Sequence, residues 1–119
     1  SALFDLKHDT GGMVDIEFIT QYIVLAYSHQ YPELIKNLGN IALLKMAGQY
    51  DLLPQDLAYT VADTYRIYRA KQHSLRLQGD DRARTKPHLM KIERQAVILL
   101  WNTVFPDAKK VLPELTSND

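Results

Sequence analysis

Two carboxylates follow a pair of glycines near the start of the chain, in the stretch KHDTGGMVDIEF that runs from Lys7 to Phe18. The adjacent glycines, Gly11 and Gly12, allow the backbone to take positive φ and allow a ligand or another segment to approach closely. A helix that begins directly after them has amino-terminal N–H groups that can face an anion or a neighbouring domain. Asp15 lies in the first turn of this helix, where the helix dipole favours a carboxylate by about 0.3–1 kcal/mol.

Glu17 follows Asp15 by two residues, so the two side chains leave the helix on different sides. This spacing leaves two interpretations open. In the first, the glycines form a flexible lead-in to the helix, and Asp15 only complements the helix dipole. In the second, four residues form a joint that faces a catalytic domain, and they are Gly11, Gly12, Asp15 and Glu17.

The elements that position these residues are predicted to be helices, because helical periodicity dominates and no window alternates as a strand does. The predicted helices cover residues 14–29, 38–49, 54–77 and 87–105. Gly79, followed by two aspartates, is expected to end the third helix. The fold class is therefore all-α, a bundle of four to five helices.

The chain is divided into three parts by these predictions. Residues 1–12 form a glycine-containing segment that leads into the first helix, residues 13–106 form the helical bundle, and residues 107–119 form a carboxy-terminal tail. No internal repeat or low-complexity linker interrupts this order.

The apolar faces of the helices give the expected core. The first helix carries a wide apolar face, so we expect it to be central. Beside its stripe of isoleucines lie Phe18, Tyr22 and Leu25. The predicted core face of the last helix consists of Leu89, Ile92, Ala96, Leu99 and Leu100, with Trp101 as an anchor. Tyr65 and Tyr68 of the third helix are expected to pack with their hydroxyls at the rim of the bundle.

Composition limits the classes of function. At 119 residues the chain is one domain that is large enough to bury a core. The 14 basic and 14 acidic residues cancel, so the whole-chain charge does not favour a nucleic acid or a membrane as partner. Cysteine is absent and the four histidines are scattered, so we expect no metal site. No apolar run approaches the roughly 18 residues of a transmembrane helix, so we expect a soluble protein.

A basic ridge lies on the third predicted helix. Its residues are spaced by three, four and three positions and share one face, and they are Arg66, Arg69, His73 and Arg76. Such a ridge is commonly a solvated face of an amphipathic helix, but it also suits contact with phosphate, a nucleotide or an acidic partner surface. Arg66 and His73 alone also match the spacing of a pair in helical ribonucleases, which is a short motif that many helices share by chance.

The glycine-pair segment resembles a signature of glutamine-synthetase adenylyltransferase. The shared pattern is a basic residue, a short polar spacer, two glycines, two variable residues and Asp-Ile-Glu-Phe. Here it consists of Lys7, Gly11, Gly12, Asp15, Ile16, Glu17 and Phe18. The uridylyltransferase of the PII signalling protein has a similar element, but the flanking residues 4–7 and 21–25 favour the adenylyltransferase and its carboxy-terminal half.

The resemblance implies that the parent enzyme transfers AMP from ATP, with magnesium, to a tyrosine of glutamine synthetase and reverses the reaction. It further implies a cytoplasmic role in nitrogen regulation, with PII protein and glutamine as regulators. The catalytic domain of that superfamily carries a Gly-Ser pair followed by Asp-x-Asp. Neither element occurs here, since Asp80 and Asp81 are adjacent and no Gly-Ser precedes them.

The sequence therefore predicts the helical accessory domain of a nucleotidyltransferase, at the carboxy-terminal end of the adenylylating half. We expect no catalytic residue and no cofactor in this chain, and we expect the enzyme's own nucleotidyltransferase domain as its partner. Two alternatives stay open. The bundle is a regulatory docking module for PII protein or glutamine, or it is a ribonuclease that uses Arg66 and His73.

Overall fold

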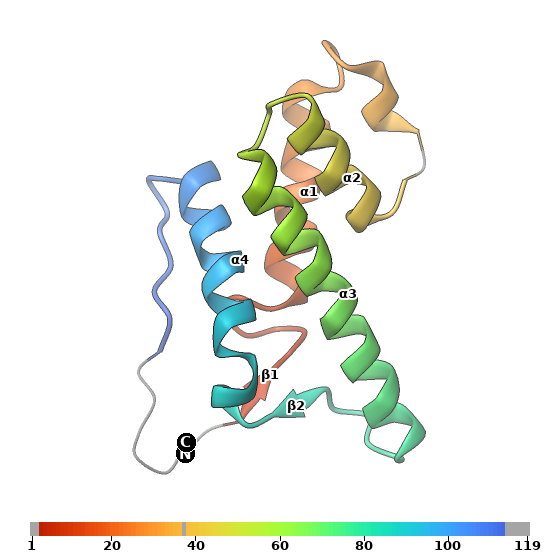
Figure 1. The fold of residues 1–119 in the computed structure, drawn as a ribbon, viewed down its shortest axis with the longest axis vertical. Helices are drawn as coiled ribbons and strands as arrows, with labels where there is room; N and C mark the ends of the chain where they lie inside the picture. Colours follow the sequence, from red (N-terminus) through yellow and green to blue (C-terminus); the bar gives the residue numbers. More distant parts are fainter. Residues whose placement is uncertain (1–2, 37, 114–119) are drawn as a thin grey trace.

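The structure, a computed structural model, describes residues 3–36 and 38–113. In chain order the elements are β1 (Phe4–Asp5), α1 (Met13–Tyr27), the 3-10 helix η1 (Pro32–Ile35), α2 (Asn40–Gln49), α3 (Gln55–Leu77), β2 (Arg84–Thr85), the 3-10 helix η2 (Pro87–Met90) and α4 (Lys91–Val104). The prediction of an all-α fold with four main helices is confirmed (Figure 1). Part of the predicted tail, residues 114–119, lies outside the described residues, and the division into three parts stays a prediction.

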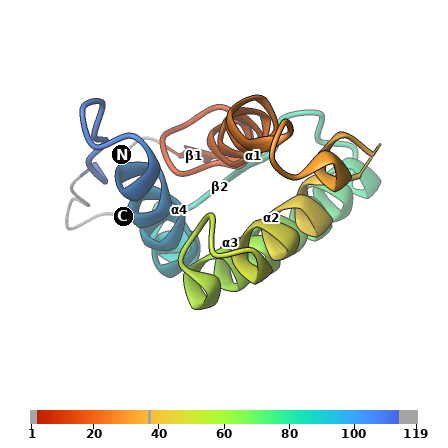
Figure 2. The same cartoon turned by 90° about the horizontal axis from the view of Figure 1, so that it is seen from above.

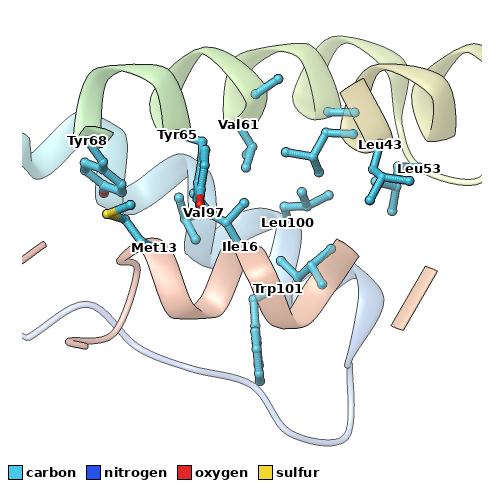
Figure 3. Packing of buried hydrophobic residues seen from close by; sticks show 14 of the residues in the cluster. Met13, Ile16, Leu43, Leu53, Val61, Tyr65, Tyr68, Val97, Leu100 and Trp101 are labelled. Carbon is cyan, nitrogen blue, oxygen red and sulfur yellow. The ribbon is translucent and has the colours of Figure 1, made fainter. Parts of the chain in front are cut away.

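The helices surround one core. The short α2 runs back along the first half of α3, and α4 lies beside α3 on its other side (Figure 1). Seen from above, α1 faces both α4 and the α2–α3 pair (Figure 2). Side chains from α1, α3 and α4 meet between these helices, where Ile16, Val61 and Leu100 are fully buried (Figure 3).

A small sheet lies at one end of the bundle (Figure 1). β1 pairs with β2 in antiparallel register, Phe4 opposite Thr85 and Asp5 opposite Arg84. The amide of Leu6 extends this contact by donating to the carbonyl of Ala83 (2.7 Å). The prediction that the chain has no strand is wrong here, because strands of two residues are too short to leave an alternating pattern. The sheet holds the segment before α1 next to the segment before α4.

The buried face of α4 differs from the predicted one. Three residues of the predicted core face are exposed: Leu89 by 56%, Ile92 by 76% and Leu99 by 58%. The buried face instead consists of Arg94, Val97, Ile98, Leu100 and Trp101, so the expectation of Trp101 as a core anchor is confirmed. Apolar residues occur on most sides of α4, so their pattern does not define one face. The charge of Arg94 suggested that its side of the helix faces solvent.

The wide apolar face predicted for α1 is buried only in part. Only its isoleucine face is buried, with Ile16, Ile19 and Ile23 between 0% and 2% exposed. Phe18 on the opposite side is 55% exposed and Leu25 is 81% exposed. The residues described here therefore bury one side of α1 and leave an apolar side open.

Neighbouring leucines of α4 provide a test of its orientation. Leu100→Ala is expected to lower the free energy of unfolding by about 2–5 kcal/mol, because the side chain is fully buried. Leu99→Ala, the matched control with the same chemistry one residue earlier, is expected to change it by less than about 0.5 kcal/mol. Urea denaturation followed by circular dichroism measures both. Equal losses, or a larger loss for Leu99→Ala, would contradict the orientation of α4.

Candidate functional site

A tight bend precedes α1 and is built from residues 5–12. The carboxylate of Asp5 accepts the amides of Lys7 (2.9 Å) and His8 (3.0 Å), which turns the chain directly after β1. The carboxylate of Asp9 accepts the amide of Asp5 (2.8 Å), and the carbonyl of Asp9 accepts the amide of Gly12 (2.8 Å). These short-range hydrogen bonds hold the segment in a compact turn. Asp side chains commonly accept such bonds from backbone amides in turns.

The glycine pair is needed for two different physical reasons. Gly11 has φ +83°, a backbone conformation that costs a residue with a Cβ about 1–2 kcal/mol. Gly12 has an ordinary φ of −93°, but a Cβ on it would lie 2.5 Å from the carbonyl oxygen of Leu6. The bend is therefore a close approach of backbone to backbone, and both glycines are buried.

The amino-terminal N–H groups of α1 are used inside the domain. The amide of Met13 donates to the carbonyl of Leu6 (2.7 Å), and that of Val14 donates to the carbonyl of Lys7 (2.9 Å). The expectation that the glycines leave these groups free for an anion or another domain is wrong. The bend folds back over the start of the helix and satisfies them itself.

Asp15 lies beneath the bend and is 6% exposed. Its Oδ2 accepts the amide of Gly11 (2.8 Å), and its Oδ1 forms an ion pair with Nζ of Lys110 (2.6 Å). The Lys110 ammonium also lies 4.0 Å from the ring centroid of Trp101, a cation–π contact. Both oxygens of Asp15 therefore have partners in this chain, and the segment after α4 is fastened to the start of α1.

Two further residues close around the bend. The hydroxyl of Tyr68, a fully buried residue, donates to the carbonyl of Gly11 (2.7 Å), so the expectation of a hydroxyl at the bundle rim is wrong for it. Burial raises the pKa of Tyr68 above its ordinary value. Arg94 donates from Nε to the carbonyl of Thr10 (3.0 Å), and its guanidinium lies 4.1 Å from the ring centroid of Phe4. Burial lowers the pKa of Arg94.

Sequence reasoning missed Arg94, Tyr68 and Lys110 as parts of this site. Arginine and lysine are usually on the surface, so their charge pointed away from burial. A usable signal exists for Arg94, which shares a helix face with the buried Val97 and Trp101.

Glu17 belongs to a second polar cluster, which joins three helices. Its Oε2 accepts the hydroxyl of Tyr65 (2.7 Å), and that hydroxyl accepts the side-chain amide of Asn40 (3.2 Å). The hydroxyl of Thr20 donates to the side-chain oxygen of Asn40 (2.5 Å) and also lies 2.9 Å from the carbonyl oxygen of Glu17. Burial, together with the hydrogen bond to Glu17, raises the pKa of Tyr65 to about 12.

The open side of α1 carries an apolar surface next to these clusters. We call it the α1 face, and it consists of Val14, Phe18, Tyr22 and Leu25, between 38% and 81% exposed. The ring of Phe18 lies 5.4 Å from that of Trp101, and both Phe18 and Tyr22 contact the ring of Phe105 edge-on, at 5.6 and 5.0 Å. Figure 3 shows Trp101 apart from the other labelled core side chains, toward the segment after α4. The α1 face is thus backed by a cluster of aromatic rings.

The predicted basic ridge gathers along one groove. All four of its residues line a groove of about 350 Å³, and they are Arg66, Arg69, His73 and Arg76. Arg66 is ion-paired with Asp63 (2.7 Å) on the same helix. The structure therefore separates the two predicted sets, with the glycines and carboxylates at the start of α1 and the ridge along the outer part of α3.

The described residues contain neither a metal-binding cluster nor a membrane-spanning helix. Within residues 3–36 and 38–113, no three His, Asp or Glu side chains are placed to hold a metal ion. In the same residues, no helix is both long and apolar enough to pass through a membrane. Asp80 and Asp81 lie exposed in the loop after α3, where Asp80 accepts the amide of Arg82 (2.9 Å).

The close approach at Gly12 can be tested against a matched glycine. Gly12 and Gly39 both precede a helix with extended backbone, but a Cβ on Gly39 would meet nothing within 4 Å. We expect Gly12→Ala to lower the free energy of unfolding by about 1–3 kcal/mol more than Gly39→Ala does, because it forces backbone atoms apart. Chemical denaturation of both variants measures this difference. Equal losses would contradict the close approach.

Comparison with known proteins places the chain in a family. A family model described as GlnD PII-uridylyltransferase matches residues 2–98. A bifunctional glutamine synthetase adenylyltransferase/adenylyl-removing enzyme of Bordetella bronchiseptica is 52% identical over 90% of this chain. Proteins of the same description from Burkholderia mallei and Idiomarina loihiensis are 53% and 47% identical over 86% and 90% of the chain.

The chain spans only 11% of the length of each of these three relatives. The resemblance inferred from the glycine-pair signature is confirmed by these matches. Contact of Gly11, Gly12, Asp15 and Glu17 with another domain stays a prediction. The chain belongs to the family described by the GlnD PII-uridylyltransferase model, and over most of its length it is similar to a segment of bifunctional glutamine synthetase adenylyltransferase/adenylyl-removing enzymes.

Proposed function

We propose that this chain is the helical domain that follows the nucleotidyltransferase domain in the adenylylating half of a glutamine synthetase adenylyltransferase. That enzyme moves AMP from ATP to a tyrosine of glutamine synthetase and also removes it. ATP and magnesium bind to the catalytic domain, which the Asp-x-Asp pair marks, and this chain carries no such pair. The names of the relatives support this proposal. In the same proposal the enzyme works in the cytoplasm, and PII protein is one of its regulators.

The observation that carries the proposal is the α1 face. Its residues follow each other by four, four and three positions, which keeps them on one side of the helix. Contiguous exposed apolar surface of this kind marks an interaction site, and aromatic residues are enriched in the centres of such sites. A bundle that worked alone would gain nothing from leaving Phe18 and Leu25 in water.

The occupant that we propose for the α1 face is the nucleotidyltransferase domain of the same polypeptide. The curated relatives are about nine times longer than the matched segment, since it covers 11% of their length. A domain in the same polypeptide is present at high effective concentration, so a surface of modest area is enough to hold it.

The bend residues receive a supporting role in this proposal. Gly11, Gly12 and Asp15 hold the start of α1 against α3 and α4, and so they set which side of α1 faces out. Glu17 lies at the border of the α1 face, where Tyr65 holds one carboxylate oxygen and Oε1 has no partner among the described residues. We propose Glu17 as the polar contact at the edge of the interface, where rims of interfaces are typically polar.

The full-length enzyme tests this function. Phe18→Ser and Leu25→Ser are expected to reduce AMP transfer to glutamine synthetase by about tenfold or more, equivalent to about 1.4 kcal/mol of transition-state free energy. Adenylyl removal, measured on the same samples, is expected to stay unchanged. Leu25 has the more exposed side chain of the two, so its loss leaves the bundle folded.

Leu77→Ser is the control variant. Leu77 is 76% exposed at the end of α3, away from the α1 face, and its loss is expected to leave AMP transfer unchanged. If both α1 variants transferred AMP at the normal rate, or if Leu77→Ser impaired transfer equally, the proposed function of the α1 face would be wrong.

A further inference from the structure

The basic groove lies between the start of α2 and the second half of α3. Ile41 forms its wall on the α2 side, while the α3 side carries Arg69, His73 and Arg76. The groove has a volume of about 350 Å³, within the range of small-ligand sites in proteins. It lies outside the bend and outside the α1 face, so the proposed function makes no use of it.

Positive charge in this groove is only partly compensated. No aspartate or glutamate lines it, and the partner of Arg66 is Asp63. Among the described residues, Arg69, His73 and Arg76 form no ion pair with a carboxylate. The whole chain has a formal net charge of zero, so this surplus of positive charge is a local feature. An exposed surplus of this kind attracts anions by its field.

The types and spacing of the cations favour phosphate as the anion. Guanidinium groups bind phosphate oxygens in a bidentate geometry that lysine does not offer. Arg69 and Arg76 are separated by about 10 Å along the helix axis, with His73 between them. Two or three linked phosphates offer anionic oxygens to both guanidinium groups when the long arginine side chains converge, whereas a single carboxylate reaches only one of these groups. The start of α2 at Asn40 adds the positive end of its dipole nearby.

We propose that this groove is a binding site for the phosphates of a small ligand with two or more linked phosphate groups. Arg69 and Arg76 hold the phosphates, His73 donates a hydrogen bond between them, and Ile41 provides an apolar wall. The ligand is either a free polyphosphate or a nucleotide, and both present the same chemistry to the arginines. This site shares no residue with the α1 face, so the proposal does not depend on the proposed function.

The experiment uses the isotope-labelled 119-residue chain and three probes: pyrophosphate, ATP and adenosine. We expect pyrophosphate and ATP to shift the NMR signals of Ile41, Arg69 and His73, and adenosine to leave them in place. Tighter binding of ATP than of pyrophosphate identifies a nucleotide as the source of the phosphates, and equal binding identifies a free polyphosphate.

Two pairs of variants separate this site from general attraction. Arg69→Gln with Arg76→Gln is expected to weaken pyrophosphate binding by about tenfold, as measured by calorimetry. Lys71→Gln with Lys91→Gln removes the same charge from side chains that do not line the groove, and is expected to weaken binding much less. Circular dichroism checks that both proteins are folded. The proposal is overturned if millimolar pyrophosphate leaves the groove signals unchanged, or if both pairs weaken binding equally.

Discussion

The start of α1 depends on how closely the chain passes over itself at Gly12. Because this residue has no Cβ, the carbonyl of Leu6 reaches the helix and accepts the amide of Met13 at 2.7 Å. With the backbone in this position, Gly11 offers its amide to Asp15 and its carbonyl to Tyr68. One close approach of backbone to backbone therefore organises hydrogen bonds from three separate parts of the chain.

These bonds determine the rotation of α1 about its own axis. Tyr68 of α3 binds the carbonyl of Gly11, and Lys110 after α4 binds Asp15, so the isoleucine side of the helix faces α3 and α4 and Phe18 and Leu25 are left in solvent. The hydrogen bond between Tyr65 of α3 and Glu17, two residues after Asp15, fixes the same rotation. The acidic residues that follow the glycines thus act through the helix, by orienting the apolar surface that we propose as the interface.

The helices and the family could be predicted from the sequence, because both depend on local patterns of residues. Helical periodicity predicted four helices, and Gly79 ends α3 with φ +86° as expected. The partners of the bend could not be predicted, since they come from far along the chain. Gly11 and Tyr68 are 57 residues apart, and Asp15 and Lys110 are 95 residues apart.

The buried face of α4 was predicted wrongly for a related reason. Arg94 was not among the residues predicted for the core, because a charged side chain is costly to bury. The structure places it against Phe4 and the carbonyl of Thr10, 84 residues away, which offset part of that cost. A pattern of apolar residues cannot reveal such a partner, so the exposed row that includes Leu99 was taken for the core face.

Hydrogen exchange at the bend tests the central claim most directly, because it reports whether the start of α1 is closed by its own chain. The amides of Gly11, Met13 and Val14 should exchange as slowly as those of the core of α3, through global unfolding. Exchange at the rate of the exposed loop around Asp81 would show that the bend opens freely. In that case it would not hold the orientation of α1, and the account would be wrong.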